Sequence, residues 1–447
     1  MTGFVSTEEW VERGRVARQA MSRKALAEHV IASDRPDPVA LKYASDEGRD
    51  ADLLPLKYER MGVSPLAFYR GFAAMHAYDL GQGQHSGLNV QLCGDMHLSN
   101  FGVYASPERN FVFDVNDFDE TLPGPFEWDL KRLVTSFAVM GRTRGFSPAA
   151  TSAAVRTVAE AYRRRITELA EMNYLSVWYD RMDQSTLETF AGSMAKKRVD
   201  KKFEAGLSKA RGKSHARAAA KLTEVVDGKR RFRSDPPLLN PIDRTTAESG
   251  MLTQLFAGYL STLSADRAQL LERYRMIDIA RKVVGVGSVG TRCWVILLEG
   301  RGPEDLLVLQ AKEAGPSVLE PYLRKSAYRH QGRRVVEGQR LTQAASDIFL
   351  GWVNGVDQSR QFYLRQLHDM KGGVDPDRMP ATNVRPYAEI CGVGLARAHA
   401  RAGGATMIAT YLGSGDKADR ALAEYAEAYA DQNDRDYTEF MAARAGS

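Results

Sequence analysis

The chain has few cysteines and no long apolar run. Its three cysteines, Cys93, Cys293 and Cys391, are widely spaced and form no CxxC pair. This spacing argues against both a disulfide framework and a structural zinc site, so we expect reduced, buried thiols. No eighteen apolar residues run together, and the charged N-terminal stretch contains no apolar core of signal-peptide length. We therefore expect a cytoplasmic protein without a membrane span.

The sequence also lacks internal repeats and low-complexity tracts, and its composition is ordinary for a soluble globular protein. Hydrophobic residues make up 44% of the chain and charged residues 26%. A chain of 447 residues is long for a single core, so two or three lobes are expected. We expect a catalytic portion in residues 1–175, a helical basic insertion and connection in 176–270, a β-rich lobe in 271–370 and C-terminal helices in 371–447.

Positive charge is concentrated in residues 196–233, which contain 14 lysines or arginines and 4 acidic residues. Apolar residues recur among these charges at roughly helical spacing, so we expect a helical insertion. One interpretation is an electrostatic surface for an acidic partner, a phosphorylated substrate or nucleic acid; the other is a solvated helical face without a ligand. Aromatic residues are scarce among the basic ones, so nucleic acid is the less favoured partner.

Acidic and amide side chains are concentrated in CGDMHLSN, residues 93–100, and in FVFDVNDFDE, residues 111–120. Burying carboxylates is costly unless cations or donors compensate, so this clustering among apolar residues needs a cause. Asp95 and Asn100, followed by Asp117 at the end of a strand, suit a magnesium-bound phosphate. Carboxylate and amide oxygens bind hard cations, while the remaining aspartate can accept a proton from an attacking hydroxyl.

Neighbouring residues in this region have more than one interpretation. The aspartates and asparagines also suit a tight turn without any ligand. For Asp119, contact with a second metal ion and a role without a metal ion are equally favoured. Asp114 lies within the strand and is expected to support the turn. His97 is more typical of a structural hydrogen-bonding residue than of a ligand. Asp129 falls in the first turn of the helix that begins in GPFEWDL, where it can accept backbone N–H groups.

A glycine-rich stretch, GVGSVGT, follows at residues 285–291 between two strand-like runs. The pattern GxGxxG alone is weak evidence. A dinucleotide-binding loop leads from a strand into a helix, whereas here TRCWVILLEG continues as a strand. The context favours a hairpin that covers nucleotide phosphates, with a simple hairpin turn as the alternative. The β-branched runs around this stretch predict three short strands in meander order.

The third of these strands, LLVLQAKEA, carries Lys312 out of an apolar run. Burying a lysine is costly without an anionic partner, which a nucleotide phosphate or a helix glutamate would supply. The alternative is a surface lysine on an edge strand.

Together these motifs resemble the protein-kinase-like fold and are most similar to its aminoglycoside and choline phosphotransferase branch. That branch carries a catalytic loop HGDxHxxN, an IDW or IDF metal motif and then GDPxxDLA. CGDMHLSN, NDF and GPFEWDL are similar, with Cys93 in place of the histidine. Over nearly its full length the chain also resembles a bacterial family catalogued as domain of unknown function 2252, through its GDxHxxNFG and DFDE motifs.

The kinase-like resemblance implies an α+β, two-lobed fold with a mainly helical catalytic lobe and a β-rich nucleotide-covering lobe. It implies an ATP- and Mg²⁺-dependent phosphotransferase that acts on an unidentified hydroxyl-bearing substrate. Kinases place the glycine loop before the catalytic loop, whereas this chain has the reverse order, so we expect a circular permutation. Two alternatives remain open: a nucleotide-binding pseudokinase or regulatory scaffold and, less favoured, a metal-dependent phosphoesterase.

The resemblance also implies residue roles. Asp95 would be the catalytic aspartate, and Asp129 would support its loop. The metal ligands would be Asn100, Asp117 and, for a second ion, Asp119. The nucleotide would be held by Gly285, Gly287, Ser288 and Gly290 over the phosphates, by Lys312 on the α and β phosphates, and by backbone groups near Gln366 and Leu367 on the adenine. Lys312 would pair with a glutamate of a helix in residues 317–341, with Glu337 favoured over Glu320.

Overall fold

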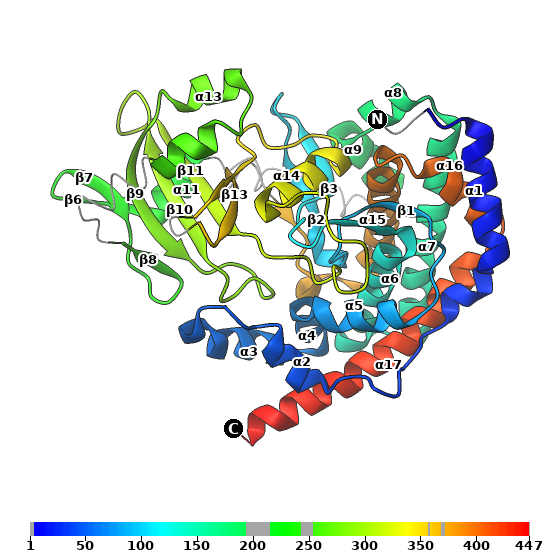
Figure 1. The fold of residues 1–447 in the computed structure, drawn as a ribbon. Coiled ribbons are helices and arrows are strands. Elements are labelled where there is room, and N and C mark those ends of the chain that lie inside the picture. The colour runs from blue at the N-terminus through cyan, green and yellow to red at the C-terminus, as the bar shows by residue number, and fades with distance from the viewer. Residues whose placement is uncertain (1–3, 194–214, 243–253, 356–357, 368–371, 447) are drawn as a thin grey trace.

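The protein has an α+β fold, in which a body of long helices lies beside a twisted antiparallel sheet (Figure 1). The computed structural model describes residues 4–193, 215–242, 254–355, 358–367 and 372–446. Within these ranges, no helix combines the length and the hydrophobicity needed to cross a membrane. All three cysteines are buried and free, which confirms the prediction from their spacing.

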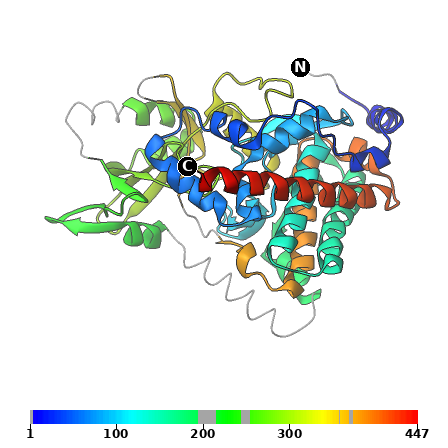
Figure 2. The same cartoon turned by 90° about the horizontal axis from the view of Figure 1, so that it is seen from below.

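Four long helices form the centre of the helical body. They are α6 (Phe126–Thr143), α7 (Pro148–Glu171), α15 (Ala381–Arg401) and α17 (Lys417–Ala445). Helix α7 begins at Pro148, because the side chain of Ser147 accepts a hydrogen bond from Ala150 N and Pro148 takes the first helical position. Helix α6 is buried on almost every side. Figure 2 shows α17 running along one face of this body toward the sheet.

Shorter helices surround this centre. On its outer side lie α1 (Thr7–Ala20) and α16 (Ala405–Leu412) (Figure 1). On the side toward the sheet lie α2 (Pro38–Ala44), α3 (Leu54–Gly62), α4 (Pro65–Gly71) and α5 (Ala73–Gln82). Others are α8 (Tyr174–Tyr179), α9 (Gln184–Ser193) and α13 (Ala265–Leu271), and 3₁₀ turns occur at Arg23–Ala27, Ala51–Leu53, Leu98–Asn100 and Pro376–Arg378.

The large sheet has six strands in the order β12-β13-β11-β10-β9-β8. They are β8 (Leu239–Pro241), β9 (Arg275–Lys282), β10 (Cys293–Glu299), β11 (Leu306–Glu313), β12 (Gly351–Asn354) and β13 (Gln361–Gln366). Strands β9, β10 and β11 pair antiparallel in sequence order, which confirms the predicted meander. Helix α14 (Gln331–Thr342) lies between this sheet and the smaller strands of the helical body (Figure 1).

The smaller strands carry the two acidic motifs. A four-stranded sheet contains β2 (Phe101–Ala105), β3 (Phe111–Val115), β5 (Met182–Asp183) and β14 (Gly372–Gly373), and β1 (Asn89–Leu92) pairs with β4 (Leu122–Pro125). Every residue of β3 is buried, although β3 contains Asp114. The loop of residues 93–100, here called the Asp95 loop, precedes β2. The loop of residues 116–121, here called the Asp117 loop, follows β3.

The helical prediction for residues 196–233 is wrong from Thr223 onward. Part of this segment, residues 196–214, lies outside the described residues. The rest forms α11 (His215–Leu222) and a hairpin of β6 (Thr223–Val226) and β7 (Lys229–Phe232). Asp227 and Gly228 have φ angles of 50° and 72°. Positive φ at both central positions is the signature of a type I′ turn, which joins two strands tightly and so overrides the helical spacing.

The predicted helix of residues 317–341 is also shorter than expected, since α14 begins only at Gln331. The preceding residues are held as a loop by Glu120. Ser317 Oγ donates to Glu120 O at 2.8 Å, and Val318 N donates to Glu120 Oε2 at 2.8 Å. These contacts attach the start of the segment to the Asp117 loop.

Candidate active site

Three of the predicted site residues lie together at one end of the β2–β3 hairpin. Asn116 N donates to Asn100 O at 2.9 Å, so Asn100 lies beside the residue that precedes Asp117. Asn100 Nδ2 donates to Asp95 O at 2.7 Å. Strand pairing therefore brings Asp95, Asn100 and Asp117 into one neighbourhood, as their spacing predicts.

Asp95 is oriented by a buried arginine that the sequence analysis missed. Arg132 Nε donates to Asp95 Oδ1 at 2.6 Å, and Arg132 Nη2 donates to Tyr69 O at 2.8 Å. His97 Nε2 lies 3.9 Å from Asp95 Oδ2. Burial holds the pKa of His97 well below its usual value, and the charges of Arg70 and Arg132 lower it further. His97 is therefore neutral, and its Nδ1 accepts a hydrogen bond from Ser99 N.

Asp129 supports the Asp95 loop from below. Its carboxylate accepts hydrogen bonds from Cys93 N at 2.7 Å and from Gly94 N at 2.9 Å. Gly94 has a φ of +97°, and a Cβ at this position would lie 2.2 Å from Glu120 O. Only glycine suits this position, because a side chain would be strained and would collide with backbone. The glycine of the GD pair is thus explained by close packing between the two acidic loops.

The acidic loops meet the large sheet at Lys312. The Lys312 ammonium, on β11, forms an ion pair with Asp119 and lies 3.9 Å from Asp117 Oδ2. Tyr363 lies on the neighbouring strand β13, opposite Lys312, and its hydroxyl donates to Asp119 Oδ1 at 2.7 Å. Burial lowers the pKa of Lys312, but the charges of Asp117 and Asp119 raise it by more, so the pKa lies well above its usual value. The buried amine is therefore charged.

The two aspartates of the Asp117 loop differ in their compensation. Burial raises the pKa of Asp117, Asp119 raises it further, and Lys312 and Arg365 only partly oppose this. Burial acts in the same direction on Asp119, but Lys312 and Tyr363 lower the pKa of Asp119 below its usual value. Asp117 also keeps 34% of its side chain exposed. It is thus the carboxylate at which an added cation would bring the larger electrostatic gain.

The donor set is consistent with a hard cation at Asp117, with Asn100 as the amide ligand. Asp119 has both oxygens engaged, by Lys312 and Tyr363, so a second metal ion would have to displace one of them. In the described part of the chain, no group of three or more histidines, cysteines, aspartates and glutamates is arranged to bind a metal. Any metal ion here would rely on the phosphate oxygens of a ligand for part of its coordination.

The prediction that Lys312 pairs with Glu337 or Glu320 is wrong. Glu337 lies 3.7 Å from Arg333 and 3.9 Å from Arg340 on its own helix. Because α14 is shorter than predicted, a residue other than Glu337 makes the contact between α14 and the acidic loops.

That residue is Arg334. It donates to Thr121 O at 2.7 Å, to Asp119 O at 2.8 Å and to Gly315 O at 2.9 Å. Arg334 therefore fixes the backbone of the Asp117 loop against α14, and Lys312 takes its counter-charge from that loop instead of from the helix.

This correction has a testable consequence for Glu337. Its two ion pairs are spaced i,i+3 and i,i+4 on a partly exposed helix face, and such pairs contribute only about 0.5 kcal/mol or less. We expect Glu337→Gln to change the free energy of unfolding by no more than this amount. Urea denaturation followed by tryptophan fluorescence would measure it. A loss several times larger would show that Glu337 has a partner inside the site.

The glycine-rich loop is fixed to the helical body through its carbonyl groups. Arg49 Nη1 donates to Gly287 O at 2.9 Å and to Val289 O at 2.8 Å, and Arg60 Nη1 donates to Gly285 O at 2.6 Å. Gly285 has a φ of +68°. The carbonyls of this loop therefore face the N-terminal helices.

The C-terminal half of the same loop is held in a similar way. Gly290 has a φ of +87°, and its carbonyl accepts a hydrogen bond from Asp50 N at 2.8 Å. Ser288, at the turn, accepts from Thr291 Oγ1 through its own carbonyl at 2.8 Å. The loop remains a turn between strands, as predicted.

The N–H groups of Gln366 and Leu367 already have acceptors within the protein. Gln366 N donates to Asp347 Oδ2 at 2.8 Å, and Leu367 N donates to Val308 O at 3.0 Å. That backbone groups near these two residues bind adenine stays a prediction, in which other groups than these two N–H donors would make the contact. Residues 368–371, which follow, lie outside the described residues.

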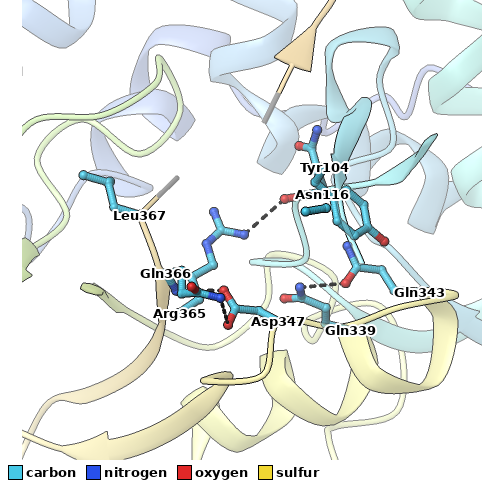
Figure 3. A pocket seen from close by; sticks show the side chains of 9 residues that line it. Tyr104, Asn116, Gln339, Gln343, Asp347, Arg365, Gln366 and Leu367 are labelled. Carbon is cyan, nitrogen blue, oxygen red and sulfur yellow. Dashed lines mark hydrogen bonds between the residues drawn. The ribbon is translucent and has the colours of Figure 1, made fainter. Parts of the chain in front are cut away.

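An open pocket with a cavity volume of about 60 Å³ lies beside these two residues (Figure 3). Its lining comes from the β2–β3 hairpin, α14 and β13, and consists of Tyr104, Ala105, Asn116, Gln339, Gln343, Asp347, Arg365, Gln366 and Leu367. Arg365 Nη1 donates to Asn116 O at 3.2 Å, directly before Asp117. The lining of the pocket is thus mixed polar and apolar, and Arg365 connects it to the acidic residues.

Comparison with known proteins places the chain in a bacterial protein family. A family model described as "Uncharacterized protein conserved in bacteria (DUF2252)" matches residues 49–443. No curated protein and no solved structure matches the chain. The matched range contains Arg49, the glycine-rich loop, both acidic loops and Lys312.

Proposed function

Because the chain belongs to this family of uncharacterised bacterial proteins, whose description names no activity, we propose a function from the site itself. We propose an ATP- and Mg²⁺-dependent phosphotransferase that acts on a hydroxyl-bearing substrate. Its fold would be a two-lobed, protein-kinase-like one in which the order of the motifs is circularly permuted.

The main support is the ion pair of Lys312 with Asp119, which joins residues 193 positions apart in sequence. It brings the lysine of the large sheet next to the Asp117 loop, although the glycine-rich loop and Lys312 follow the acidic motifs in the chain. Phosphoryl transfer depends on the positions of such groups and not on their order in the sequence. A basic residue, a carboxylate with an incompletely compensated charge and a glycine-rich turn are the parts such a reaction needs.

Each residue then has a stated task. Asp95 would accept the proton of the acceptor hydroxyl through Oδ2, since Oδ1 is engaged by Arg132. Lys312 would leave Asp119 in part to contact the nucleotide phosphates. Asn100 and Asp117 would hold Mg²⁺, which when bound neutralises charge on the phosphates. The glycine-rich loop, held by Arg49 and other groups of the helical body, would cover them.

Calorimetry with ATP, with and without Mg²⁺, tests this proposal. We expect the parent protein to bind ATP only weakly without the metal ion. Asp117→Ala should weaken Mg–ATP binding at least tenfold, which is about 1.4 kcal/mol. The exposed Asp34 offers a matched control, because Asp34→Ala also removes a carboxylate, but one outside the two acidic loops, and should leave the affinity unchanged. Equal affinity of the parent with and without Mg²⁺ would contradict the proposed metal site.

A further inference from the structure

Arg70 lies at the C-terminal end of α4, between the Asp95 loop and the glycine-rich loop. One side is defined by Arg132, which donates both to Asp95 Oδ1 and to the carbonyl of Tyr69, the residue before Arg70. The other side is defined by Gly287, where a Cβ would lie 3.3 Å from Arg70 O. The tip of the glycine-rich loop therefore rests on the backbone of Arg70, and Asp95 lies next to the same turn of helix.

The guanidinium of Arg70 is incompletely compensated. Its Nε is buried and has no hydrogen-bond partner among the residues that the structure describes. Burial lowers the pKa of Arg70, and the carboxylates of Asp377, Asp95 and Asp375 only partly oppose this. A buried donor without an acceptor in a native fold calls for an explanation, and a bound ligand is one.

The other arginines around the site do not share this property. Arg132, Arg334 and Arg365 each donate hydrogen bonds to oxygen atoms of the acidic loops. Their roles are accounted for by the folded chain alone. Arg70 differs from them because its Nε is buried and has no acceptor among the described residues.

We propose that Arg70 forms a subsite for a phosphoryl anion and binds the terminal phosphate of the nucleotide between Gly287 and Asp95. This inference rests on the proposed phosphotransferase function. A planar guanidinium matches two phosphate oxygens at once, so it binds and orients the group better than a point charge does. In the transfer, the acceptor oxygen forms the new P–O bond and the bond to the β–γ bridging oxygen breaks. The electron pair leaves with ADP, and the acceptor proton passes to Asp95.

The test compares nucleotides that differ only in the terminal phosphate. The affinities of Mg–ADP and of a non-hydrolysable Mg–ATP analogue would be measured by calorimetry for the parent protein, Arg70→Gln and Arg70→Lys. We expect Arg70→Gln to lower the affinity for the triphosphate about tenfold and that for ADP less than about twofold. Arg70→Lys keeps the positive charge but cannot bind two phosphate oxygens at once. Its loss of affinity for the triphosphate should therefore be smaller than that of Arg70→Gln.

Several outcomes separate this inference from the proposed function. Equal losses for both nucleotides in Arg70→Gln, or no loss for the triphosphate, would overturn the Arg70 subsite and leave the phosphotransferase standing. A parent protein that binds neither nucleotide would overturn both. Arg156→Gln is the matched control, because Arg156 is exposed on α7 and pairs with Asp416, outside the acidic loops and the glycine-rich loop. It should keep the preference of the parent for the triphosphate, and thermal unfolding of each variant shows that it is folded.

Discussion

Replacing Asp95 with asparagine is expected to lower the rate of phosphoryl transfer at least about a hundredfold, the lower end of the contribution of a positioned general base. Asparagine has nearly the same shape, and its carbonyl oxygen can still accept the hydrogen bond from Arg132 Nε. It cannot accept the hydroxyl proton, so the chemical step should fail while the loop keeps its position. The release of ADP from Mg–ATP, in water and with candidate hydroxyl compounds, would report the loss.

Nucleotide affinity supplies the control for this experiment. In the proposed mechanism Asp95 acts on the acceptor hydroxyl and Asp117 holds the metal ion, so Asp95→Asn should bind Mg–ATP within about threefold of the parent, well under one tenfold step. Asp34→Asn is a matched control, since Asp34 is exposed and outside both acidic loops. A variant of Asp95 that loses nucleotide affinity in parallel with its rate would assign the residue to binding. A rate within a few fold of the parent would exclude Asp95 as the base.

Local patterns predicted the elements that carry the site. The run FVFDV forms β3 and ends just before Asp117, and the helix that begins at Phe126 places Asp129 in its first turn. The glycine-rich stretch forms a turn between β9 and β10. Each of these features depends on alternation, capping or turn chemistry within a few residues, so the sequence alone was sufficient.

The partner of Lys312 depends on contacts that no local pattern encodes. Tyr363 and Asp119 reach Lys312 only because β11 and β13 pair in a particular register and because Arg334 fixes the Asp117 loop. The loop before α14 also depends on Glu120, which is distant in sequence. The position of Glu337 on the predicted helix therefore favoured it as the ion-pair partner of Lys312, whereas the tertiary structure places Asp119 there.

Two missed features did leave a signal in the sequence. The pair Asp227–Gly228 between short runs rich in β-branched and basic residues is typical of a two-residue hairpin, and it outweighs the helical spacing around it. Arg132 follows Asp129 by three positions, so both lie on the same side of α6 and face the Asp95 loop. Reading each acidic motif together with the helix that follows it would have identified this arginine.

The largest loss of stability is expected at Asp114, the buried residue of β3. Its carboxylate forms an ion pair with Arg397 of α15, and both side chains are fully buried. It also accepts hydrogen bonds from Val115 N and Ala344 N. Asp114→Ala would leave the Arg397 guanidinium buried without its counter-charge, and breaking such a pair from one side costs about 3–5 kcal/mol. Urea denaturation would measure the difference in the free energy of unfolding.

The double variant Asp114→Ala with Arg397→Leu distinguishes a lost charge pair from lost packing. Removing both charges leaves no unpaired ion, so this variant should recover a large part of the stability that Asp114→Ala loses. Arg397 Nε and Nη1 have no hydrogen-bond partner among the described residues, which makes the guanidinium especially dependent on Asp114. Glu168→Gln, which breaks an exposed pair with Arg165, should cost less than about 0.5 kcal/mol. If Asp114→Ala costs no more than Glu168→Gln, then α15 does not hold the strand that delivers Asp117, and the site must derive its rigidity from Arg334 and Asp129 instead.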